Sequence, residues 1–145
     1  LHRQAEELDA GVFSRLRIPV NESEAEFRAQ LHNLALILVD LLNEKSVIKG
    51  MDRVSGERGL DKLKRFLVNN GYEYVDRDIS LLRKVQQMRS RIAAHASGSG
   101  GRAFLEKELG DRSHREYVVE LIEESTQMLL DLQRFAIRHA SARGR

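Results

Sequence analysis

The stretch that decides the fold is Leu82–Arg–Lys–Val–Gln–Gln–Met–Arg–Ser–Arg–Ile–Ala–Ala–His95. Apolar residues recur in it and just after it at steps of three and four, at Leu82, Val85, Ile92 and Ala96, with Met88 at the flank. This spacing predicts a helix that buries one face. Such a helix needs other elements to cover that face, so the rest of the chain is expected to pack around it.

Two residues of this helix carry chemistry, Arg89 and His95. On a wheel of about 100° per residue, Arg89 falls inside the apolar stripe, where an unpaired guanidinium is costly. Arg89 must therefore meet a carboxylate, a phosphate, a wet cleft or a second subunit. Asp40, in the otherwise apolar run 34–42, is a candidate partner for it. His95 lies about 120° from Arg89 on the same wheel, at the edge of the stripe.

The composition predicts an all-α fold. The 145 residues include a single proline, Pro19, and no tryptophan, and they carry charges of both signs with a formal net charge of +2. No stretch shows the alternation typical of strands, so we expect an up-and-down bundle of four to five helices in one domain over residues 1–145. The chain begins with Leu1 and shows no signal-peptide pattern. We expect a fragment of a longer protein, with an upstream sensor domain as a hypothesis.

The residue types also exclude several kinds of site. No cysteine is present, which excludes disulfides, thiolate catalysis and cysteine-ligated metals. The histidines show no pattern typical of a metal site, and we expect no metal and no cofactor. The apolar run 34–42 is too short to span a bilayer. We therefore expect a cytoplasmic protein without a membrane partner.

Further helices are predicted around the central one, over residues 24–44, 60–67, 103–109 and 113–140. Ser113 and Glu116 fit a capping box that opens the last of them. Asp76 or Asp78 is the expected cap of the central helix. The glycine-rich run 96–101 is expected to end that helix and to form a loop.

Charge is unevenly distributed along the chain. No acidic residue lies between Asp78 and Glu106, a segment that contains Arg83, Lys84, Arg89, Arg91 and Arg102. The last twelve residues carry four arginines and no acid. Such patches favour a polyanionic partner such as RNA, although a run of surface arginines is also typical of a solvated face.

The run Arg89–Ser–Arg–Ile–Ala–Ala–His95 resembles the signature of the HEPN superfamily, helical domains of nucleotide-binding and RNA-cutting proteins. That signature is an arginine, usually followed by a polar residue, and then a histidine after four to six intervening residues, late in a long helix. Arg89 and His95 match it with five residues between them, and Ser90 occupies the polar place. The resemblance extends loosely over the helical layout of residues 24–140, the expected HEPN-like core.

The resemblance implies a metal-independent endoribonuclease that acts as a homodimer, with the two motifs facing each other across a cleft. His95 would take the proton from a ribose 2′-hydroxyl or protonate the leaving 5′-oxygen, since histidine titrates near neutrality. Arg89 would hold the phosphate and stabilise the transition state. The products would carry 2′,3′-cyclic phosphate and 5′-hydroxyl ends. The resemblance also implies an effector of a defence or toxin system.

Candidates for substrate binding surround the motif: Ser90, Arg91, Arg83, Lys84 and Arg102. Arg91 is an alternative to Arg89 as the phosphate-binding arginine, because it lies four residues before His95 on the same side of the helix. The sequence leaves both arginines open. Two other functions also stay open. One is a non-catalytic helical module for dimerisation or partner binding, in which Arg89 pairs with a carboxylate, and the other is a basic adaptor that binds nucleic acid without cutting it.

Overall fold

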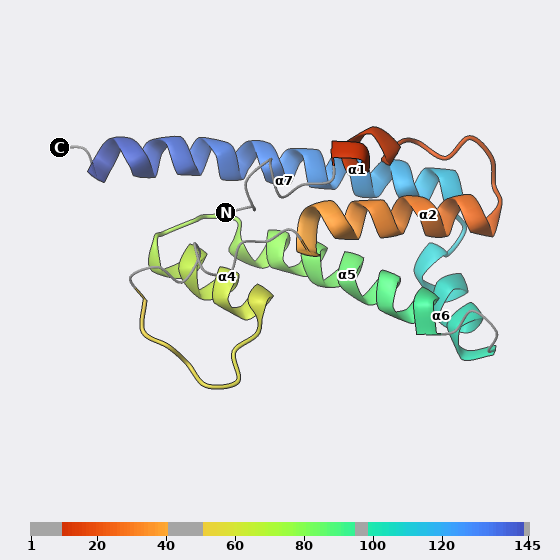
Figure 1. Ribbon diagram of the computed structural model, residues 1–145, viewed down its shortest axis with the longest axis horizontal. Coiled ribbons are helices and arrows are strands. Elements are labelled where there is room, and N and C mark those ends of the chain that lie inside the picture. The colour runs from red at the N-terminus through yellow and green to blue at the C-terminus, as the bar shows by residue number, and fades with distance from the viewer. Residues whose placement is uncertain (1–9, 41–50, 95–98, 144–145) are drawn as a thin grey trace.

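The computed structural model describes residues 10–40, 51–94 and 99–143, and these residues form helices and no strands. The all-α class is therefore confirmed. The helices of the described residues are α1 (Ala10–Arg15), α2 (Glu24–Ala35), the π-helical segment η2 (Leu36–Asp40), α4 (Gly59–Asn69), α5 (Val75–Ala94), α6 (Ser99–Leu109) and α7 (His114–Arg143). The bundle consists of α2, α4, α5 and α7, and α1 and α6 pack against it (Figure 1).

α5 is the central helix of the bundle. It contacts α2, α4, α6 and α7, and it runs in the direction opposite to α2 and α7 (Figure 1). Its buried face repeats at steps of three, with Ile79, Leu82, Val85 and Met88 all at most 2% exposed. Burying one such side chain stabilises a fold by roughly 1.5–3 kcal/mol. This face therefore anchors α5 and, with it, the Arg89 segment that follows.

Local signals in the sequence set several helix ends. Ser113 and Glu116 form the expected capping box at the start of α7: the Ser113 amide donates to the Glu116 carboxylate at 2.8 Å, and the Glu116 amide donates to the Ser113 hydroxyl at 3.1 Å. Ser23 caps α2 by accepting from the Glu26 amide at 3.2 Å. Gly71 follows α4 with a φ of +71°, a left-handed conformation that costs glycine little. These ends could be predicted from short-range chemistry alone.

The start of α5 corrects one prediction. The helix begins at Val75, so Asp76 and Asp78 both lie in its first turn and neither is its cap. Asp78 is only 1% exposed, because it accepts hydrogen bonds from neighbouring side chains inside the bundle. Tertiary contacts therefore decide its role.

The glycine-rich run corrects a second prediction. α6 begins at Ser99 and includes two glycines that were expected to lie in a loop; residues 95–98 lie outside the described part of the chain. Glycine costs a helix about 1 kcal/mol relative to alanine. That cost is outweighed because α6 buries Leu105 and Leu109, which are 8% and 9% exposed, against the bundle.

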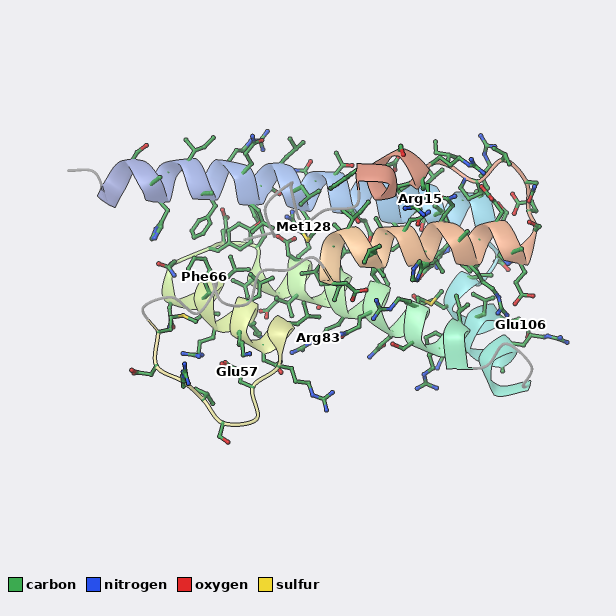
Figure 2. The ribbon with its side chains drawn as sticks, in the orientation of Figure 1. Arg15, Glu57, Phe66, Arg83, Glu106 and Met128 are labelled. Atoms are coloured by element: carbon green, nitrogen blue, oxygen red, sulfur yellow. The ribbon has the colours of Figure 1, made fainter. Side chains whose placement is uncertain are left out.

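Two ion pairs tie α5 to α7. Arg77 Nη2 lies 2.7 Å from Asp131 Oδ2, and Lys84 Nζ lies 3.0 Å from Glu124 Oε2. In both helices the paired residues are seven positions apart, which is two turns or about 10 Å of helix. The equal spacing on two antiparallel helices fixes their register. Met128, which lies between the two acids in sequence, points from α7 towards the rest of the bundle (Figure 2).

Candidate functional site

Arg89 reaches from α5 to the end of η2. Its Nη1 donates to Oδ2 of Asp40, and the two side chains are 27% and 33% exposed. The pairing of Arg89 with Asp40 expected from the sequence is therefore confirmed. A guanidinium has five N–H donors, and this ion pair uses a single guanidinium nitrogen. The Asp40 carboxylate therefore orients the Arg89 guanidinium, and the guanidinium remains accessible to solvent.

Asp40 owes its position to the π-helical segment. In η2 the backbone hydrogen bonds span five residues instead of four, which widens the turn and changes the face on which the following residues lie. Ile37 and Leu38 remain buried at 8% and 3% exposure, while Asp40 at the end of η2 meets Arg89. Such segments occur frequently at functional sites. No periodicity in the sequence indicated this change of helix type.

The second motif residue, His95, lies outside the described residues, one position beyond Ala94, the last residue of α5. Its role stays a prediction. Ser90 is exposed on α5, and so is Arg91, whose guanidinium carbon lies 5.0 Å from the ring centroid of Phe104 on α6. Arg89 and Arg91 thus face different neighbours, and the choice between them is a choice between two sides of α5.

The other candidates for substrate binding lie apart from one another. Arg83 extends from α5 towards α4, where its Nη2 lies 2.7 Å from Asp61 (Figure 2). Lys84, the next residue, pairs with α7 instead. Arg102 is exposed on α6. Its charge acts on Glu24 of α2: the pKa of Glu24 is lowered chiefly by the hydrogen bond to Arg28 and, to a smaller extent, by the charge of Arg102. Arg83 and Lys84 are therefore each paired with an acid of a different helix.

A polar cluster forms around two buried carboxylates at the start of α5, and it was not predicted from the sequence. Tyr72 Oη donates to Asp78 Oδ2 at 2.5 Å, and Arg77 Nε donates to Asp78 Oδ1 at 2.7 Å. The same guanidinium donates to Asp131, so Arg77 bridges two carboxylates that are 1% and 7% exposed. Gln127 adds two hydrogen bonds to Asp131 at 3.1 Å. We call these five residues the Arg77 cluster.

The Arg77 cluster shifts the pKa values of its members. Burial, together with the hydrogen bond to Asp78, raises the pKa of Tyr72, so the phenol stays protonated. The hydrogen bond to Asp78, followed by the one to Asp131, raises the pKa of Arg77. Hydrogen bonds from Gln127 and then Arg77 lower the pKa of Asp131. One signal in the sequence could have found the cluster: the seven-residue spacing of the bases 77 and 84 equals that of the acids 124 and 131.

The described residues offer neither a metal site nor a membrane-spanning helix. In the ranges 10–40, 51–94 and 99–143, no three or more histidine, aspartate or glutamate side chains group in a way that could hold a metal ion. No helix in the described part of the chain is long and apolar enough to cross a membrane. Of the predicted site residues, His95 is the one that lies outside the described part of the chain.

Comparisons with known proteins add no relative. No family model matches the chain, and neither a curated protein nor a solved structure does. The resemblance to HEPN proteins therefore rests on residues 89–95 and on the helical layout.

Proposed function

We propose that the chain is a metal-independent endoribonuclease of the HEPN type, in which Arg89 holds the scissile phosphate and His95 transfers the proton. The observation that supports this is the setting of Arg89. It lies on the central helix, fixed by Asp40, and it is 27% exposed. A guanidinium that is oriented and still reachable by solvent suits an incoming phosphate.

The chemistry needs only these side chains and the substrate. The ribose 2′-oxygen attacks phosphorus and gives up its proton to a base, and the bond from phosphorus to the 5′-oxygen breaks as that oxygen takes up a proton. The negative charge that builds up on the phosphate oxygens is stabilised by Arg89. The products are a 2′,3′-cyclic phosphate and a 5′-hydroxyl. We propose that the enzyme acts on RNA as a homodimer in the cytoplasm, as the effector of a defence or toxin system.

The test is incubation of the purified chain with labelled RNA in excess EDTA, comparing the parent with Arg89→Ala and His95→Ala. We expect chelator-resistant cleavage with cyclic-phosphate ends, lowered about 10²–10³-fold by Arg89→Ala, the loss typical when one donor to a transition-state anion is removed. No cleavage by the parent, or equal cleavage by all three proteins, would contradict the proposal.

Arg65 offers a matched control. Like Arg89 it is a partly buried arginine, 24% exposed, and it pairs with a carboxylate outside its own helix, Glu57, at 2.7 Å. It belongs to α4 and has no part in the proposed reaction. Arg65→Ala should therefore leave cleavage within about twofold of the parent, which separates loss of the catalytic group from loss of an ion pair.

A non-catalytic module for dimerisation or partner binding is the second candidate. The same ion pair favours it, because the charge of Arg89 is already balanced by Asp40 within the chain. In that case Arg89→Ala and Asp40→Ala would lower stability by similar amounts. Neither would change any reaction of RNA.

A further inference from the structure

Three arginines among the described residues lie over an aromatic ring. The guanidinium carbon is 4.4, 5.0 and 4.8 Å from the ring centroid in the pairs Arg77–Tyr74, Arg91–Phe104 and Arg112–Tyr117. Two of these guanidinium groups also pair with acids, Arg77 with two carboxylates and Arg112 with Glu120. Arg91 differs from both, because it makes no ion pair with any residue in the ranges 10–40, 51–94 and 99–143. The described part of the fold therefore leaves the charge of Arg91 available to a partner.

We propose that Arg91, held on Phe104, is a platform on which an unpaired base of the RNA stacks, beside the nucleotide whose phosphate Arg89 holds. This inference rests on the function proposed above, because it takes RNA as the substrate. It adds the part of the substrate that Arg91 binds, a nucleobase instead of a phosphate. It also adds the class of RNA, which is single-stranded.

Phe104 holds the guanidinium of Arg91 in place. Phe104 lies on α6 and packs against the hydrophobic core, and α6 packs against α5 (Figure 1). The ring covers one face of the guanidinium. Arg91 is exposed, so the opposite face is turned to solvent. A flat cation that is supported by a ring on one side offers its other side to the π-face of a base.

The open face of Arg91 suits a base better than a carboxylate. A carboxylate binds a guanidinium along its N–H edge, in the plane of the group, whereas a base stacks on its face. The surrounding sequence agrees with a polyanionic partner, because no acidic residue lies between Asp78 and Glu106. In a duplex each base is already stacked between its neighbours, so the platform is open only to single-stranded RNA.

Arg89 and Arg91 bind different parts of the RNA. Arg91 lies two residues after Arg89, which places it about 3 Å further along the axis of α5 and about 200° around it. The two side chains also reach different elements, Arg89 reaching η2 and Arg91 reaching α6. Arg89 therefore holds the scissile phosphate, and Arg91 binds the base of a neighbouring nucleotide on the other side of α5.

The test compares two uncleavable oligonucleotides of about eight nucleotides. One is single-stranded 2′-O-methyl RNA, and the other has the same backbone and the same number of phosphates but no bases. Fluorescence anisotropy in excess EDTA measures their affinities for the full chain. Arg91→Lys keeps the charge and loses the plane, so it should weaken binding of the first about tenfold, as for one stacked base, and leave the second within about twofold. Phe104→Leu keeps an apolar side chain and removes the ring, so it should weaken binding of the first about threefold.

Arg112→Lys is the matched control, since it changes an arginine that also lies over a ring but whose charge is balanced by Glu120. It should leave both affinities within about twofold of the parent. Circular dichroism checks that all variants are folded. A parent that binds the two oligonucleotides equally would overturn the proposal. An equal loss for both oligonucleotides in Arg91→Lys would also overturn it, because that is the behaviour of a phosphate contact.

Cleavage separates this proposal from the one on which it rests. A parent that cleaves RNA, but binds both oligonucleotides with the affinities of Arg91→Lys, refutes the platform alone. A parent that prefers the oligonucleotide with bases, and loses this preference in Arg91→Lys, but cleaves no RNA, refutes the nuclease alone. A parent that binds neither oligonucleotide also overturns the platform.

Discussion

Two arginines on the same helix, Arg77 and Arg89, both pair with a carboxylate from another element, yet their surroundings differ. Arg77 bridges two carboxylates that are 1% and 7% exposed, and Tyr72 and Gln127 complete their hydrogen bonds. Arg89 has one carboxylate partner, and both members of that pair are about 30% exposed. The Arg77 cluster is held by two buried carboxylates, although the Arg77 side chain is itself 45% exposed, whereas in the Arg89–Asp40 pair the carboxylate is partly exposed as well. The function proposed above requires this exposed carboxylate to give way to a phosphate of the RNA.

The largest expected effect is at the Arg77 cluster. Asp78→Ala leaves the buried Tyr72 phenol without its acceptor and removes one carboxylate from the half-exposed Arg77 guanidinium. It should lower the free energy of unfolding by about 2 kcal/mol, the cost of leaving a buried polar group unpaired together with the loss of a charged hydrogen bond. Urea denaturation followed by circular dichroism measures it. The matched control is Asp76→Ala, two residues earlier in the same turn, whose side chain is 91% exposed and should cost under about 0.5 kcal/mol. Equal losses in both variants would show that burial does not distinguish them.

The contribution of the Arg77 cluster to stability should also depend on pH. The pKa of Asp131 is lowered in the folded chain by its hydrogen bonds to Gln127 and Arg77. As the pH falls, Asp131 therefore becomes protonated in the unfolded chain first, at about pH 4. Below that pH the ionised Asp131 carboxylate contributes progressively less to the free energy of unfolding. The difference in unfolding free energy between the parent and Asp131→Asn should be constant above about pH 5 and shrink towards pH 2. A difference that does not change with pH would contradict the assigned role of the carboxylate.

The Arg89–Asp40 pair should contribute less. We expect Asp40→Ala to lower the free energy of unfolding by about 1 kcal/mol, since both side chains are partly solvated. The same urea titration measures it beside Asp78→Ala. If the loss at Asp40 reached that at Asp78, Arg89 would be a structural residue like Arg77, and the comparison between the two pairs would fail.

The smallest expected effect on stability is at the Arg83–Asp61 pair on the surface between α5 and α4. Its members are 47% and 49% exposed. Arg83→Ala should change the free energy of unfolding by less than about 0.5 kcal/mol, as is usual for exposed ion pairs. A fall of several degrees in the melting temperature of this variant would show that exposed ion pairs in this bundle are stronger than their solvent exposure suggests.

The elements that could be predicted from the sequence depend on local chemistry. The helical period around Leu82, the capping box at Ser113 and the turn at Gly71 each rest on residues close together in the chain. The sequence also offered the Arg89–Asp40 pair as one of several possibilities, because an arginine inside an apolar stripe needs a partner or solvent and Asp40 is the one acid in the apolar run 34–42.

The remaining features depend on contacts between distant residues. The π-helical segment that brings Asp40 to α5 has no signature in the apolar run that forms it. Local spacing makes Asp76 or Asp78 the expected cap of α5, whereas the partners of Asp78 are the side chains of Arg77 and Tyr72 and, through Arg77, the bundle helix α7. The helix at Ser99–Leu109 starts within glycines because packing outweighs their low helix propensity.

The measurement that tests the central claim most directly is the affinity for an RNA oligonucleotide with 2′-O-methyl groups, which cannot be cleaved, by fluorescence anisotropy in excess EDTA. If Arg89 exchanges Asp40 for a phosphate, Arg89→Ala should weaken binding about tenfold, the loss of one charged contact, while Arg65→Ala should leave it within about twofold. Equal affinities of the parent, Arg89→Ala and Arg65→Ala would contradict the claim, because the Arg89 guanidinium would then serve the fold alone.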